Sequence, residues 1–308
     1  MLFVDVLEKI EQELRPEFNR LIETAFSRQT HIGDLLIWYN NGFYDETTLN
    51  FKPADGKVYN PHLIGPGEIG HSEYAHYRFI DQYRRAYLYK LPLSEYLPLL
   101  EYTPERRKEI EDLHEFEETT INLEMLVYLK FWEADSIIKK FYELARIVNS
   151  EHYDWYFKID ESNRDKTSTG VRHEIIRKKI RDRFQNEFPI IYNAFKTAYK
   201  SQIRNAIAHS KYSFQQRNIH IHNYIAEDKF SQIKSVSFDE WIDLFHITTV
   251  IHNEYINIGN FVRDEYANLA LKNNNILPVR ITEISGKQYE LLVKYRPEFQ
   301  DWGYLQSK

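Results

Sequence analysis

Three residues near the end of an apolar helical segment, Arg204, Asn205 and His209, have side chains suited to phosphodiester chemistry. Histidine exchanges protons near neutral pH, and arginine offers a permanently charged planar fork to phosphate oxygens. Metal-free cleavage of RNA needs a base for the 2′-hydroxyl, a proton for the departing 5′-oxygen and positive charge beside the phosphorus. At 100° per residue Asn205 and His209 share a helical face, whereas Arg204 and His209 lie about 140° apart. The end of a single helix therefore does not direct Arg204 and His209 toward the same point.

The segment from Ser201 to His209 resembles the signature of the HEPN ribonuclease family, R-x(4–6)-H with a polar residue, often Asn, directly after the arginine. The resemblance covers roughly residues 120–270 and rests on this motif and on the order of the helices. It implies a metal-independent endoribonuclease that leaves a 2′,3′-cyclic phosphate and a 5′-hydroxyl. His209 would act as the acid or base, Arg204 as the phosphate ligand and Asn205 as the positioning group.

The resemblance also implies partners. Similar proteins form homodimers, so that two copies of the motif face one cleft, and many carry an acidic residue on the preceding helix that orients the arginine; Glu174 is the candidate here, with Glu187 second. Such proteins serve as toxins or abortive-infection effectors against phage, cleave tRNA, mRNA or rRNA, and can be controlled by an antitoxin or sensor. Some are modified on a Tyr two residues after the His. Here Tyr212 follows three residues after, so we do not assign it that role.

The arginine–histidine spacing alone is not specific, because three other pairs also match it: Arg107 with His114, Arg146 with His152, and Arg217 with His222. Only Arg204 lies at the end of an amphipathic helix, with a polar neighbour and small apolar residues inside the motif. Two other interpretations stay open. The pair could cap a helix C-terminus, or the domain could be a non-catalytic module that binds RNA or a partner.

A metal-dependent hydrolase is a third alternative, in which His220 and His222 would bind a metal with His246 or His252. Histidines two apart are commonly exposed strand residues, and no His-Glu-x-x-His spacing is present. The sequence also lacks a phosphate-binding P-loop. We therefore expect neither a metal nor a cofactor.

The formal net charge is −6, but its distribution is uneven. The segment 164–211 holds 12 basic and 4 acidic residues, which leaves −14 for the rest of the chain. A basic run is often just a solvated helix face, yet this one surrounds the motif. Its candidates for guiding the RNA backbone or touching a base are Arg172, Arg177, Lys178, Arg181, Lys200, Lys211 and Tyr212.

The elements that position the motif are predicted to be helices. Helical periodicity covers residues 2–27, with Pro16 as a break or restart, then 104–118, a long helix from about 120, and two helices at 171–188 and 189–209. Residues 217–224 alternate like a strand, Ser237 caps a helix that reaches Val262, and residues 279–295 form a hairpin turning at Ser285-Gly286.

These elements predict a mainly α fold, a HEPN-like up-and-down bundle with a small β insertion and a C-terminal β-hairpin. We expect a helical, loop-rich N-terminal region at 1–119, the bundle at 120–272 and the hairpin extension at 273–308. Between residues 42 and 70 the sequence is rich in Pro and Gly and loop-like. The chain has no cysteine, no signal-peptide pattern and no membrane-length apolar run, so we expect a cytoplasmic protein without disulfides or membrane contact.

Overall fold

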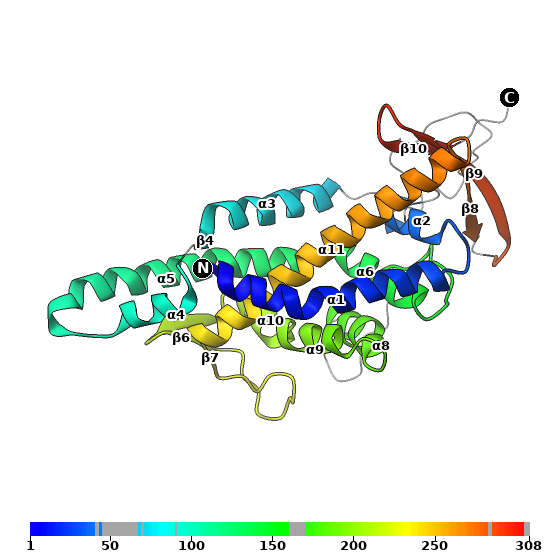
Figure 1. Ribbon diagram of the computed structural model, residues 1–308. Helices are drawn as coiled ribbons and strands as arrows, with labels where there is room; N and C mark the ends of the chain where they lie inside the picture. Colours follow the sequence, from blue (N-terminus) through cyan, green and yellow to red (C-terminus); the bar gives the residue numbers. More distant parts are fainter. Residues whose placement is uncertain are drawn as a thin grey trace. The chain divides into compact units, whose positions relative to one another are not determined.

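The computed structural model describes residues 1–40, 43–44, 67–68, 71–89, 91–159, 171–282 and 285–304. The fold is mainly helical with small β-sheets, as the sequence predicts (Figure 1). Two compact units divide it. The first comprises Met1–Pro16, Tyr74–Ala134 and Glu187–Asn253, and the second Glu17–Glu73, Asp135–Asn186 and Glu254–Lys308. The predicted boundary at 119/120 falls inside a helix.

Helices dominate the first unit. They are α1 (Val4–Arg28), which continues into the second unit, α3 (His71–Tyr87), α4 (Leu93–Tyr96), α5 (Arg107–Trp132), α9 (Pro189–Ala198), α10 (Ser201–Ala208) and α11 (Phe238–Lys272), which also continues into the second unit. Short 3₁₀ segments, η3 (Leu97–Leu100) and η4 (Pro104–Arg106), precede α5. The strands of this unit are β1 (Leu2–Phe3), β4 (Leu88–Tyr89), β5 (Tyr212–Gln215), β6 (Asn218–Ile221) and β7 (Ser235–Ser237).

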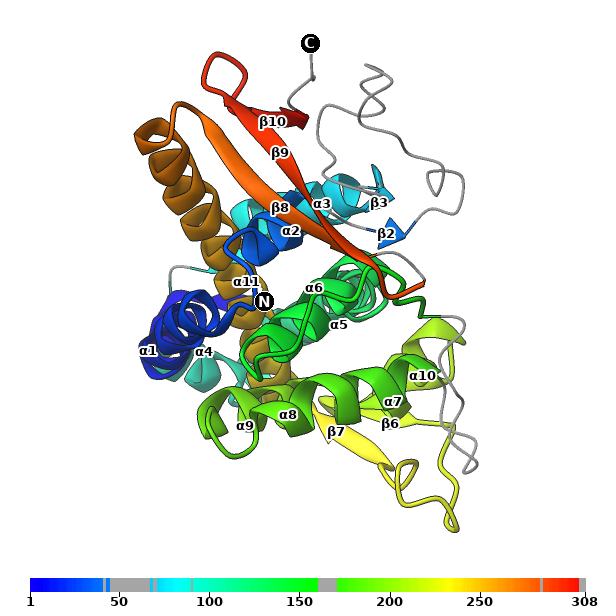
Figure 2. The same ribbon diagram turned by 90° about the vertical axis from the view of Figure 1, so that its right-hand side faces the viewer.

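The second unit adds α2 (Asp34–Asn40), α6 (Asp135–Ile147), α7 (Val171–Glu174), the π-helical segment η5 (Ile175–Arg181) and α8 (Asp182–Phe184). Its strands are β2 (Phe43–Tyr44), β3 (Gly67–Glu68), β8 (Ile276–Thr282), β9 (Gln288–Arg296) and β10 (Asp301–Tyr304). The strands β8, β9 and β10 form an antiparallel sheet (Figure 2). Most of the loop-like region predicted between residues 42 and 70 lies outside the described residues.

The predicted break at Pro16 is wrong, because α1 runs through it without interruption (Figure 1). Proline removes one helical hydrogen bond, that to the carbonyl four residues earlier. That carbonyl belongs to Gln12, and both Gln12 and Pro16 are exposed. Water can therefore solvate the freed carbonyl, and the helix continues.

The helices predicted at 104–118 and from about 120 are one helix for most of their length. After η4, α5 carries a charged first half and an apolar second half, and it ends at Trp132 with Glu133 as C-cap. The helix predicted from about residue 120 is therefore interrupted after Trp132, and α6 begins at Asp135. The sequence did not indicate this interruption. Acidic residues such as Glu117 and Glu124 are nevertheless buried on α5.

Buried polar side chains tie α5 into the first unit. Glu124 is fully buried, and it accepts hydrogen bonds from Tyr83 Oη on α3 at 2.8 Å and from Trp241 Nε1 on α11 at 2.7 Å. The amino group of Met1 also pairs with this carboxylate. A buried carboxylate is tolerated only when it is paired and hydrogen-bonded, so three elements converge on one side chain.

The capping residue of α11 and the C-terminal hairpin are confirmed. Ser237 Oγ accepts from the Glu240 backbone N–H at 3.2 Å, and Glu240 accepts from the Ser237 N–H at 2.7 Å, which is a capping box. Strands β8 and β9 pair from Ile276–Lys294 to Thr282–Gln288, and Gly286 in their turn has φ +81°. Only the third strand, β10, was not predicted. In the part of the chain that the structure describes, no helix is long and apolar enough to cross a membrane.

Candidate functional site

The motif lies on α10, a short helix separated from α9 by an extended link at Tyr199-Lys200. The sequence predicted one helix from Pro189 to His209. The interruption comes from Tyr128 of α5, whose buried hydroxyl donates to the Ala198 carbonyl at 3.0 Å and accepts from the Lys200 N–H at 3.1 Å. The tyrosine thereby satisfies backbone groups that a continuous helix would pair internally. Burial raises the pKa of Tyr128, so it remains a neutral donor.

Arg204 lies in the middle of α10 and is directed toward the end of α5. Its Nη1 is 2.7 Å from Oε1 of Glu133, and the two side chains are 15% and 30% exposed. This ion pair holds a guanidinium that is mostly shielded from water, which reduces the freedom of its long side chain. Sequence analysis did not identify Glu133, since nothing local marks a C-cap residue of another helix as the partner of Arg204.

His209 is the C-cap of α10, with φ −109° and ψ 11°, and its side chain is exposed. The next residue, Ser210, has φ +52°. The Ser210 N–H donates to the Ile207 carbonyl at 3.2 Å, and the Lys211 N–H donates to the Ala206 carbonyl at 2.8 Å. This is a Schellman ending with serine in the position that glycine usually occupies. The chain turns sharply after His209 and leaves its imidazole at the surface.

The three motif residues thus differ in exposure. Arg204 is fixed against α5, Asn205 is half-buried one residue later, and His209 is exposed at the helix end. The arrangement combines a positioned cation with an accessible proton-transfer group on one helix.

Glu174, the predicted orienting carboxylate, lies on α7 in the second unit. Its oxygens pair with Arg177 at 3.2 Å and with Lys178. The carboxylate that contacts Arg204 in the described structure is Glu133 instead. Glu187, the second candidate, belongs to the first unit, just before α9.

The predicted RNA-contacting residues fall into two groups. Arg172, Arg177, Lys178 and Arg181 belong to the second unit, and each pairs with a carboxylate, such as Asp135 for Arg172 at 2.8 Å. These pairs reduce the net charge that the basic run presents to solvent.

The other group belongs to the first unit. Lys200 donates to the Lys196 carbonyl at 2.8 Å, Tyr212 donates from its hydroxyl to Asn122 at 2.9 Å, and Lys211 is exposed next to the turn after His209. Of the seven predicted contacts, these three share a unit with the motif.

Two of the rival arginine–histidine pairs have other partners. Arg217 donates to both carboxylate oxygens of the buried Glu117 at 2.9 Å, while His222 Nε2 lies 2.9 Å from Ser213 Oγ. Arg107 pairs with Glu111 on the exposed start of α5. Each of these arginines joins a carboxylate and not its histidine.

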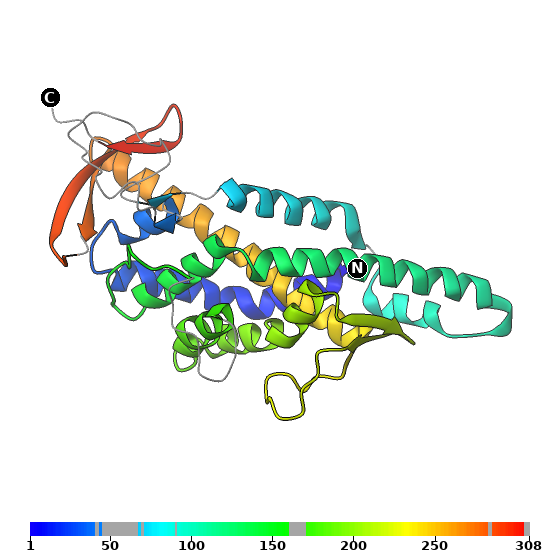
Figure 3. The ribbon, with the colours of Figure 1, turned by 180° about the vertical axis from the view of Figure 1, so that it is seen from behind.

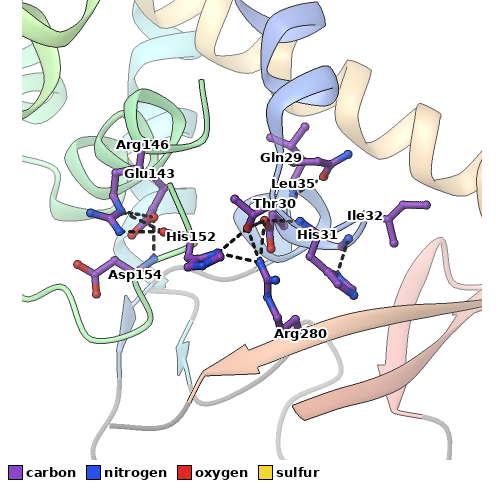
Figure 4. A network of polar contacts seen from close by, with 12 residues as sticks. Gln29, Thr30, His31, Ile32, Leu35, Glu143, Arg146, His152, Asp154 and Arg280 are labelled. Carbon is purple, nitrogen blue, oxygen red and sulfur yellow. Dashed lines mark hydrogen bonds and ion pairs between the residues drawn. The ribbon is translucent and has the colours of Figure 1, made fainter. Parts of the chain in front are cut away.

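The third rival pair belongs to a polar network of the second unit (Figure 4). Arg146 donates from Nε and Nη2 to the backbone carbonyl of His152, at 3.1 and 2.9 Å, so the imidazole takes no part. His152 Nδ1 lies 2.8 Å from Thr30 Oγ1 and 3.0 Å from Arg280 Nη2. Because a guanidinium can only donate, Nδ1 accepts. Arg146 and His152 therefore fix the loop that follows α6.

A buried carboxylate completes this network. Glu143 accepts from the Asp154 N–H at 3.0 Å, and burial raises the pKa of Glu143 to about 8. Carboxylates with raised pKa occur in active sites but also in structural networks. Glu143 contacts Arg146 on the same helix and Asp154 in the loop that follows it, so we assign it a structural role.

The histidines of the metal alternative do not come together. His246 is buried, accepts from the Phe3 N–H at 2.8 Å and lies 2.6 Å from the Ile242 carbonyl. His252 is also buried, between Tyr77 and Phe131. No group of three or more His, Asp or Glu side chains in the described segments is arranged to hold a metal ion.

Comparisons with protein-family models, with curated proteins and with solved structures yield no match to this chain.

Proposed function

We propose that this protein is a metal-independent endoribonuclease of the HEPN type, with Arg204, Asn205 and His209 as its catalytic motif. The observation that carries the proposal is the pair of side chains on α10, where a guanidinium held by Glu133 precedes by five residues the exposed histidine that caps the helix. A permanent cation and a side chain that can exchange a proton are what in-line attack by a 2′-hydroxyl requires.

In the proposed reaction the imidazole of His209 removes the proton of the ribose 2′-hydroxyl. The 2′-oxygen attacks phosphorus, Arg204 neutralises the charge that develops on the non-bridging oxygens, and the bond to the 5′-oxygen breaks. An imidazolium donates a proton to the departing 5′-oxygen. The products are a 2′,3′-cyclic phosphate and a 5′-hydroxyl.

The reaction uses one base and one acid, whereas each chain supplies one motif. We propose that a homodimer brings two copies together, so that the His209 of each protomer takes one role. Asn205 would position the scissile phosphate or the partner motif. In the cell we propose a cytoplasmic toxin or abortive-infection effector acting on tRNA, mRNA or rRNA and controlled by an antitoxin or sensor.

The chemistry is tested with a short RNA and its matched analogue carrying a single 2′-deoxyribose at the mapped cleavage position. The proposal expects cleavage of the RNA to a cyclic-phosphate end and no cleavage of the deoxy bond. Cleavage of both substrates, or a 3′-hydroxyl end, would exclude attack by the 2′-hydroxyl. A protein that binds RNA without cleaving it would favour the non-catalytic module.

A further inference from the structure

The loop that joins β6 and β7, residues 222–234, projects away from both strands (Figure 3). Its base is closed by backbone hydrogen bonds. The His222 N–H donates to the Lys211 carbonyl and the Ile221 N–H to the Lys234 carbonyl, both at 2.9 Å. Lys211 lies two residues after His209, so the loop begins beside the motif.

A side chain of the motif helix clamps this β6–β7 loop. Gln202, two residues before Arg204 and 2% exposed, donates from Nε2 to the Ile233 carbonyl and accepts from the Ile233 N–H, both at 2.8 Å. Asn223 Nδ2 donates to the backbone carbonyl of Gln202 at 3.0 Å. Both ends of the loop are therefore fixed to the helix that carries Arg204 and His209.

The loop is also ordered internally. Asp228 accepts from the Phe230 N–H at 3.0 Å and from Ser231 Oγ at 2.7 Å, and the Ile225 N–H donates to the Ser231 carbonyl at 2.8 Å. A loop with this many internal bonds presents its side chains in fixed positions. Contact with a ligand would then cost little ordering entropy.

The loop presents an aromatic ring and two exposed lysines, Lys229 and Lys234, beside the exposed Glu227. Tyr224 is 40% exposed and Ile225 51% exposed. Lys234 Nζ lies 5.1 Å from the centre of the Tyr224 ring, and Lys229 Nζ lies 5.0 Å from that of Phe230. Of the two rings only that of Tyr224 is exposed, since Phe230 is half-buried. An exposed ring beside lysines is an element with which proteins hold single-stranded nucleic acid, because a base stacks on the ring and the cations contact phosphates.

We infer that the β6–β7 loop is a stacking platform that binds unpaired RNA next to the motif, with Tyr224 as the main stacking residue. This inference rests on the proposed function and names its substrate class as single-stranded RNA. In a duplex the base faces are already stacked, so Tyr224 has no face to contact. The attachment through Gln202 and Lys211 fixes the base of the loop to the helix that carries His209 and to the turn after it.

The test is binding of a fluorescently labelled, unstructured RNA to the full chain carrying His209→Ala, a variant that the proposed function expects not to cleave RNA, measured by fluorescence anisotropy. Adding Tyr224→Ala is expected to weaken binding between about 5-fold and 100-fold. Tyr224→Phe keeps the ring and should bind as the parent does. Tyr102→Ala is the matched control, because Tyr102 is 65% exposed in the same unit but distant in sequence from the motif.

Equal binding by the Tyr224→Ala and parent proteins would overturn the inference, as would equal affinity for a duplex of the same length or no RNA binding at all. The two proposals fail separately. If cleavage survives His209→Ala while RNA binding depends on Tyr224, the nuclease motif is wrong and the platform stands. If cleavage depends on His209 while Tyr224→Ala changes nothing, the platform is wrong and the nuclease stands.

Discussion

The turn between β5 and β6 allows a quantitative test of what Arg217 does. Gln216 and Arg217 form this two-residue turn, and both have positive φ, 50° and 55°. A type I′ turn requires this conformation, which favours Asn or Gly and costs other residues about 1–2 kcal/mol. Arg217 is held there by two hydrogen bonds to Glu117, which is 2% exposed, and by one to Asp239.

Replacing Arg217 with glycine changes two terms of opposite sign. Relief of the positive φ gains about 1 kcal/mol, less the entropy that glycine adds to the unfolded chain. Loss of the guanidinium leaves Glu117 buried without its partner, which costs about 3–5 kcal/mol for a buried pair and less here because Arg217 is 23% exposed. We expect a net loss of about 2–3 kcal/mol.

The control is Gln216→Gly, which changes the same turn without removing an ion pair and should alter stability by no more than about 1 kcal/mol. Unfolding in urea, followed by circular dichroism, measures both variants. Adding Glu117→Gln to Arg217→Gly should restore part of the lost stability, because glutamine leaves no unpaired carboxylate buried at position 117. An Arg217→Gly protein as stable as Gln216→Gly would refute the reasoning and reopen a functional role for Arg217.

Three further predictions follow from single contacts. Glu133→Gln weakens the hold on Arg204 and should lower the cleavage rate by about 10-fold to 100-fold, more in kcat than in KM, while binding of RNA persists; unchanged kcat would remove Glu133 from the site. Burial lowers the pKa of His252 to about 3, so the native state takes up its proton less readily than the unfolded state, and stability is complete above about pH 6.5 and falls below it. Urea unfolding at pH 7 and 4.5 should therefore show a loss in the parent about 2–3 kcal/mol larger than in His252→Phe, and equal losses would contradict this assignment. Gln202→Ala should speed tryptic cleavage after Lys229 in the β6–β7 loop, whereas unaltered digestion would mean that the clamp does not order it.

Patterns confined to one stretch of sequence predicted the structure well. Ser237 and Glu240 are three residues apart and form their capping box, and the centre of the strand predicted at 217–224, residues 218–221, is β6. The hairpin at 279–295 turns where Ser285-Gly286 indicated. The capping box and the hairpin are each defined by interactions within the segment that was analysed, whereas β6 also needs its neighbours β5 and β7 to form a sheet.

Features that depend on distant residues were missed. Tyr128 separates α9 from α10 by bonding Ala198, 70 residues away, and Glu133 pairs with Arg204 on a different helix. Periodicity along one segment carries no information about such contacts. Pro16 was misjudged for a related reason, since whether a proline ends a helix depends on how the freed carbonyl is solvated.

For the candidate site, the sequence located the motif on a helix end but could not choose its partners. Glu174 was a reasonable carboxylate by chain order, yet it pairs with Arg177 and Lys178. The basic run was likewise counted as free charge, although the structure pairs much of it with carboxylates such as Asp135. The sum of charges along a helix does not say which of them are neutralised across it.

The central claim is that Arg204 and His209 cleave RNA without a metal. The most direct measurement is digestion of total and transfer RNA in excess chelator by the parent protein, Arg204→Ala, His209→Ala and the control His114→Ala, each first shown to be folded. We predict cleavage with cyclic-phosphate ends by the parent and by His114→Ala, and none by the two motif variants. Equal cleavage by all four proteins, or cleavage abolished by the chelator, would contradict the assignment.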